Sequence, residues 1–181
     1  RIQESGEELA VFIPGFLIAW VTFPGVVVHE FAHQLFCYLY RIPVYKVCYF
    51  RFGNPAGYVI HGPARKPWHS VMVAIGPFFI NSLVGALIAF PVVISIYRFH
   101  AFDFLGVIIA WLGLSITMHA FPSTGDAQAI MSIVKQQGVP LHTKAWAYPV
   151  VGLIYIGAVG SFFWLDLMYG ILVAGILPNL I

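Results

Sequence analysis

The stretch LAVFIPGFLIAWVTFPGVVVHEFAHQLFCYLY, from Leu9 to Tyr40, decides the fold, because it is apolar throughout and contains one acid, Glu30, and no Lys or Arg. As one straight helix it would measure about 48 Å, whereas the hydrocarbon core of a bilayer is about 30 Å thick. The segment is therefore expected to tilt, break or fold back. Pro14-Gly15 and Pro24-Gly25 are the natural break points, with Pro24 at the start of a second helix.

The composition indicates an integral membrane protein. Of the 181 residues, 60% are hydrophobic and 9% are charged, whereas soluble domains carry about 25% charged residues. At about 20 residues per crossing, the apolar segments fit four to six spans, so the sequence predicts an all-α polytopic bundle in a single domain, residues 1–181. A net charge of +2 with one short basic stretch argues against nucleic-acid binding. Cys37 and Cys48 have no CxxC spacing and indicate no thiolate metal site.

The remaining chain alternates between apolar helices and shorter polar segments. Residues 44–62 are rich in Val, Tyr, Phe and Ile around a Gly-Asn-Pro-Ala-Gly turn, and predict a short β-hairpin. The other expected elements are spans at 69–97 and 104–121, a Pro-containing break at 122–126, a short amphipathic helix at 127–137 capped by Ser123 or Thr124, and an apolar segment at 146–181 that forms two helices or one broken helix.

Basic residues predict the orientation in the membrane. Of nine Lys and Arg, five lie in the hairpin region and two lie two spans later: Arg41, Lys46, Arg51, Arg65, Lys66, Lys135 and Lys144. The positive-inside rule therefore predicts that the hairpin and the loop containing Asp126 are cytosolic and flank the same end of the bundle.

Residues 29–33, His-Glu-Phe-Ala-His, carry the chemistry. Positions i and i+4 share one helix face, so His29 and His33 can bind one zinc ion while Glu30 reaches a water on the metal. Three polar groups in apolar surroundings cost several kcal/mol unless they have partners, and ionisable residues within membrane spans by default mark functional sites. The motif therefore predicts a Zn²⁺ site.

A hydrolytic zinc needs a third protein ligand and an open position for water, whose pKa falls to about 7 on the metal. Asp126 is the first candidate, because an irregular backbone after a span can direct its carboxylate into the bundle. The alternatives are His119, His61, His69 and Asp166. Asn81, a polar group inside the second span, either polarises a substrate carbonyl or forms a structural hydrogen bond between helices.

Together these motifs resemble the site-2 protease family of intramembrane zinc metalloproteases. The resemblance rests on HEFAH in a membrane helix, a hairpin after it, Gly76-Pro77 followed by Asn81, and a Pro-containing break with Asp126, and it covers residues 24–135. It implies His29, His33 and Asp126 as zinc ligands, Glu30 as general base and acid, and Asn81 as a substrate-orienting or oxyanion residue. It also implies that the hairpin offers an edge strand to an extended substrate.

The sequence differs from the family around Asp126, which lies in Thr-Gly-Asp-Ala rather than Leu-Asp-Gly, and His119 stands where the family has Asn. His119 therefore stays an alternative ligand. The expected function is hydrolysis of peptide bonds in membrane-embedded or membrane-adjacent substrates by a protein residing in the lipid bilayer. The alternatives are a zinc-binding but non-hydrolytic adaptor, chaperone or transporter component, and a structural bundle without metal.

Overall fold

The computed structural model describes residues 15–101, 103–136 and 138–177. It is mostly helical, at 73%, with one small two-stranded sheet. Residues 9–14, including the expected break at Pro14, lie outside the described residues, as do Gln137 and residues 178–181. The elements in chain order are α1 (Gly15–Val21), α2 (Phe23–Leu39), β1 (Val44–Cys48), β2 (Tyr58–His61), α3 (Pro67–Phe99), α4 (Phe104–Met118), α5 (Thr124–Val134), α6 (Leu141–Ser161), α7 (Leu165–Gly170) and the π-helix η1 (Ile171–Ile176).

The first apolar segment breaks where the sequence predicts. Helices α1 and α2 meet at an angle of 91°, and Pro24 lies in the first turn of α2, where its missing N–H costs nothing. The break is fastened to α4, because the Ser115 hydroxyl donates to the Thr22 carbonyl and accepts from the Gly25 amide. A Cβ on Gly25 would lie 2.0 Å from the Ser115 carbonyl oxygen, so only glycine allows the two helices to approach this closely.

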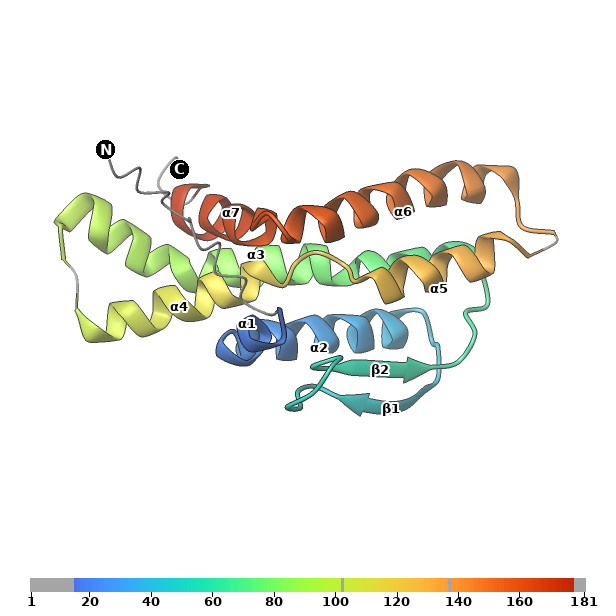
Figure 1. The fold of residues 1–181 in the computed structure, drawn as a ribbon, viewed down its shortest axis with the longest axis horizontal. Coiled ribbons are helices and arrows are strands. Elements are labelled where there is room, and N and C mark those ends of the chain that lie inside the picture. Colours follow the sequence, from blue (N-terminus) through green and yellow to red (C-terminus); the bar gives the residue numbers. More distant parts are fainter. Residues whose placement is uncertain (1–14, 102, 137, 178–181) are drawn as a thin grey trace, which may run out of the picture.

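Helix α3 forms the long axis of the bundle, and α2, α4, α5 and η1 pack against it (Figure 1). It is long and apolar enough to cross a membrane despite Pro77 and Pro91 in its interior. Among the described residues it is the one single helix that passes this test. There are up to three candidate spans if α1 with α2, and α6 with α7 and η1, each count as one bent span.

The predicted hairpin is confirmed. Strands β1 and β2 pair antiparallel, with Val44 opposite His61 and Cys48 opposite Tyr58. The hairpin lies alongside α2 (Figure 1), and the hydroxyl of Tyr49 donates to the side-chain carbonyl of Gln34 on that helix. The hairpin thereby holds its connecting loop near the middle of α2, which carries the HEFAH motif.

The second half of the chain differs from the expectation in where its helices begin. Helix α5 begins at Thr124 rather than at 127, so Asp126 lies in its first turn, and α6 begins at Leu141 rather than at 146. A bend of 103° separates α6 from the segment after it, so the apolar stretch predicted as two helices or one broken helix is divided. The start of α5 lies midway along the bundle, so the Asp126 segment is not at the end where α5 and α6 join (Figure 1). The placement of the hairpin and the Asp126 loop on the cytosolic side stays a prediction.

Candidate metal centre

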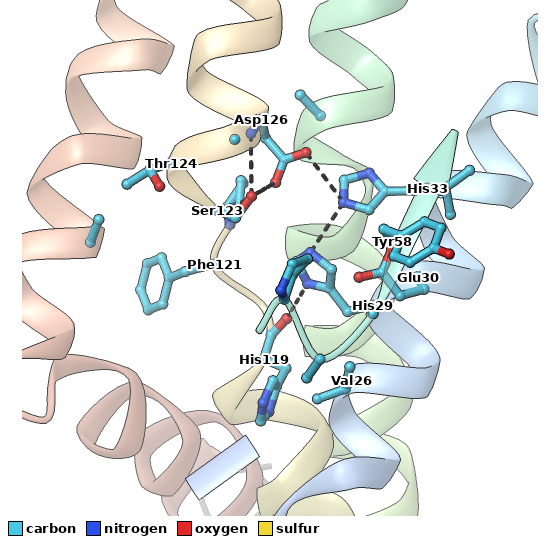
Figure 2. Close-up of a pocket in the computed structure, with 18 of the residues that line it drawn as sticks. Val26, His29, Glu30, His33, Tyr58, His119, Phe121, Ser123, Thr124 and Asp126 are labelled. Atoms are coloured by element: carbon cyan, nitrogen blue, oxygen red, sulfur yellow. Dashed lines mark hydrogen bonds and ion pairs between the residues drawn. The ribbon is translucent and has the colours of Figure 1, made fainter. Parts of the chain in front are cut away.

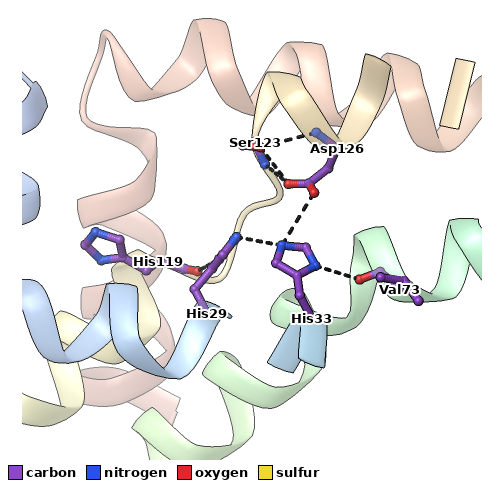
Figure 3. Close-up of polar contacts among 6 residues, drawn as sticks. All are labelled: His29, His33, Val73, His119, Ser123 and Asp126. Atoms are coloured by element: carbon purple, nitrogen blue, oxygen red, sulfur yellow. Dashed lines mark hydrogen bonds and ion pairs between the residues drawn. The ribbon is translucent and has the colours of Figure 1, made fainter. Parts of the chain in front are cut away.

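The two histidines of HEFAH face each other on α2. They are separated by one helical turn, and their Nε2 atoms lie 3.1 Å apart (Figure 3). His33 is buried and His29 is half-buried. The i, i+4 spacing therefore brings the two ring nitrogens together, as the sequence predicts.

Backbone carbonyls fix which nitrogen of each ring carries the proton. The His33 Nδ1 lies 2.9 Å from the carbonyl oxygen of Val73 on α3, and the His29 Nδ1 lies 2.7 Å from that of His119 at the end of α4. A carbonyl oxygen only accepts, so each Nδ1 is the donor. In the neutral imidazole each Nε2 then carries a lone pair, and these two lone pairs point into the same space.

Asp126 completes the group through the start of α5. Ser123 is the N-cap of this helix, and its backbone N–H and its hydroxyl each donate at 2.7 Å to Oδ2 of Asp126. The Ser123 hydroxyl in turn accepts from the Asp126 amide, which makes a reciprocal capping box. The other carboxylate oxygen, Oδ1, is thereby directed toward Nε2 of His33, 3.4 Å away (Figure 3).

These three groups fit a divalent metal ion. One ligand atom from each of His29, His33 and Asp126 can be chosen so that all lie within 4.8 Å of one another. Ligands at 2.0–2.1 Å from a tetrahedral zinc are about 3.3 Å apart, and the two closest separations here are 3.1 and 3.4 Å. Two lone pairs and a carboxylate facing one another repel unless a cation lies between them. Both histidines also donate their second ring N–H to a carbonyl, as metal-bound histidines almost always do.

Glu30 lies beside this group, at the wall of a cavity of about 820 Å³ (Figure 2). The cavity is bounded by α2, the hairpin loop, the start of α5 and the region where α6 bends into α7. The Glu30 side chain is 8% exposed, and within the described residues no group donates a hydrogen bond to its carboxylate. Gly57 of the hairpin loop packs directly onto it, since a Cβ there would lie 2.6 Å from the Glu30 Cγ.

The structure places the side chains of the two candidates for the third ligand, Asp126 and His119, differently. The ring of His119 turns back onto its own helix, where Nδ1 donates to the Ser115 carbonyl at 3.0 Å. Figure 2 shows this ring pointing away from His29 and Asp126. His119 contributes its backbone carbonyl to His29, whereas Asp126 contributes its side chain.

The remaining sequence candidates lie apart from the cluster. His61 and Asp166 line the cavity, but His61 binds the Gly62 carbonyl and Asp166 accepts from the Leu167 amide. His69 stacks on Tyr40 at the start of α3. None of the three belongs to the candidate metal group found among the described residues.

Asn81 is 0% exposed and is not among the residues that line the cavity. Its Nδ2 lies 3.1 Å from three carbonyl oxygens, those of Gly25, Ile116 and His119. The alternative of a structural hydrogen bond between helices is confirmed. A role in orienting substrate stays a prediction.

Two residues that shape the site went unrecognised in the sequence as parts of it. The sequence predicts Ser123 as a possible helix cap, and the structure adds a second effect, because Ser123 turns Oδ1 of Asp126 toward His33. The Ser-x-x-Asp pattern of a capping box is the sequence signal for this effect. The sequence predicts Gly57 as a turn residue, and its contact with Glu30 leaves no local signal because it joins segments far apart in sequence. No protein-family model matches the chain, and no curated protein or solved structure matches it either.

Proposed function

We propose that this protein is an intramembrane zinc metalloprotease of the site-2 protease type, with His29, His33 and Asp126 as metal ligands. The observation that carries the proposal is the convergence of two histidine lone pairs and one carboxylate oxygen beside the free carboxylate of Glu30. Without a bound cation, such a group of polar side chains is costly in apolar surroundings.

Each residue has a role that follows from its surroundings. Zinc, when bound, supplies a Lewis acid that polarises the scissile carbonyl and makes water acidic. Glu30 is the general base and acid: its carboxylate accepts the proton of the attacking water and returns it to the leaving amine. Because no donor in the described part of the chain occupies that carboxylate, it is available to accept a proton. The Val73 and His119 carbonyls hold the two imidazoles in the tautomer that leaves Nε2 free.

The hairpin provides a way to hold an extended substrate. Strand β2 contributes Tyr58, Val59 and His61 to the cavity wall, and its described pairing is with β1 alone. Amides of a helical substrate are occupied by helical hydrogen bonds, so a membrane segment has to unwind before it is cut. A free strand edge replaces those bonds with new ones.

The charge distribution supports a multi-pass protein with its basic end in the cytosol. Five cationic residues lie in the connections from α2 to β1, β2 to α3 and α5 to α6, or in the first turn of α6, at one end of the bundle (Figure 1): Arg41, Arg65, Lys66, Lys135 and Lys144. Arg98 lies at the opposite end of α3. We infer from the positive-inside rule that the hairpin base and the connection between α5 and α6 face the cytosol.

The decisive experiment changes Glu30→Gln, which keeps size and polarity but removes the base. Membrane proteomes of cells that express the wild type or the variant are compared by mass spectrometry, and zinc is quantified in the purified proteins. We expect one zinc per chain in both purified proteins. We also expect that membrane proteins cleaved in cells with the wild type remain intact in cells that express Glu30→Gln. The control is Asp103→Asn, since Asn caps α4 as well as Asp does.

Two outcomes contradict the proposal. Equal cleavage by the wild type and Glu30→Gln would mean that another group activates water or that the protein is not a protease. Bound zinc without any cleavage that depends on Glu30 would favour a non-hydrolytic zinc protein, such as an adaptor, chaperone or transporter component.

A further inference from the structure

The backbone carbonyl of His119 is a junction between the metal centre and the interior of the bundle. It accepts from His29 Nδ1 at 2.7 Å and lies 3.1 Å from Nδ2 of Asn81. A carbonyl oxygen has two lone pairs, so these two donors fill its capacity. One donor is a proposed zinc ligand, and the other is a fully buried amide on α3.

The position of this carbonyl is not fixed by helical bonding. Helix α4 ends at Met118, and the last carbonyls of a helix have no donor four residues further on. The chain after His119 turns toward Pro122, so α4 does not continue and supplies no such donor. Asn81 reaches across from α3 instead, and its two N–H bonds serve the carbonyls of Ile116 and His119 together with that of Gly25 on α2.

We propose that Asn81 is a positioning residue for the metal centre, which holds the His119 carbonyl in place and thereby fixes the ring orientation and tautomer of His29. The inference rests on the metal centre of the proposed function, but it does not require that the protein is a protease. If the His119 carbonyl moves, His29 loses the acceptor for its Nδ1 proton. The ring is then free to carry its proton on Nε2, where it has no lone pair for a metal.

Ser115 separates this role from simple helix packing. It is also fully buried, and its hydroxyl also links α4 to α2, through Thr22 and Gly25. Neither of these hydrogen bonds involves the His119 carbonyl. A variant at Ser115 therefore weakens the packing of α4 against α2, the two helices that Asn81 contacts from α3, without removing the donor that fixes the carbonyl.

The experiment compares Asn81→Leu, Asn81→Ser and Ser115→Ala in the purified full chain. Zinc affinity is measured by competition with a chelator, and the d–d absorption spectrum of the Co²⁺-substituted protein reports the ligand geometry independently of activity. We expect Asn81→Leu to bind zinc more weakly, with an altered cobalt spectrum; complete loss of the outer hydrogen bond of a ligand costs about 10–100-fold, which is the upper limit for this more distant change. Ser115→Ala is expected to keep the affinity and spectrum of the wild type while its metal-free form melts at a lower temperature.

Asn81→Ser keeps one hydroxyl donor and is expected to lie between the wild type and Asn81→Leu. It also provides the measurement if Asn81→Leu does not fold. Zinc affinities of the Asn81 variants equal to that of Ser115→Ala would overturn the inference, and so would altered cleavage with unchanged zinc affinity, which indicates substrate contact instead. Absence of zinc binding by the wild type overturns both proposals, whereas zinc binding without proteolysis overturns only the protease.

Discussion

The contact between Gly57 and Glu30 allows a test of the proposed base that leaves the base itself in place. Replacing Gly57→Ala adds one methyl group to the hairpin loop. Gly57 is not among the residues with positive φ, so the backbone accepts alanine. The three atoms nearest the added Cβ all belong to Glu30: Cγ at 2.6 Å, Oε1 at 2.8 Å and Cδ at 3.0 Å. The perturbation is therefore directed at this one side chain.

The size of the effect follows from these distances. Carbon atoms that are not bonded pack at about 3.5–4.0 Å, so the loop or the Glu30 side chain has to move by about 1 Å. A displacement of about 1 Å in a catalytic group costs about 100-fold in rate, or roughly 2.7 kcal/mol in activation free energy. Zinc binding is expected to be unchanged, because His29, His33 and Asp126 are not among the atoms displaced.

The assay measures initial cleavage rates in proteoliposomes. The substrate is a membrane protein that remains intact in cells that express Glu30→Gln. The matched control is Gly53→Ala in the same loop, where the nearest atom to the added Cβ is in the Arg51 side chain at 3.6 Å, an ordinary contact. We expect wild-type rates from Gly53→Ala and about 100-fold slower cleavage from Gly57→Ala, each with full zinc content. Equal rates for the two variants would refute the reasoning that Glu30 acts from the position it holds beneath the loop.

The remaining predictions concern the third ligand. Ser123→Ala removes the hydroxyl that binds Oδ2 of Asp126, so we expect the zinc affinity, measured by chelator competition, to fall about 10–100-fold. The control is Ser132→Ala, which removes a hydroxyl that bonds only within α5, and we expect it to leave the zinc affinity unchanged. An unaltered affinity in Ser123→Ala would show that the capping box does not orient the ligand. His119→Gln changes a ring that does not face the metal but keeps the carbonyl, so we expect one zinc per chain by metal analysis; loss of the zinc would favour His119 as the ligand instead of Asp126.

Much of the framework was predictable from the sequence, because it depends on neighbours along the chain. The break before α2, the hairpin after it and the long α3 follow from local proline placement, β-branched content and apolar length. The pairing of His29 with His33 follows from helical spacing alone. Helix α5 begins three residues before the predicted start, because the capping box at Ser123 extends the helix backward into the predicted break.

The sequence by itself determined that two imidazoles and a glutamate share an apolar helix, and it nominated Asp126 ahead of His119 without separating them. Only the tertiary structure shows that the side chain of Asp126, and not the ring of His119, faces the histidine pair, because this depends on where α4 ends and how α5 begins beside α2. The same packing gave Asn81 three carbonyl partners and placed Gly57 on Glu30. Such contacts join segments far apart in the chain, and their geometry is set by helix packing, which no local pattern of residues records.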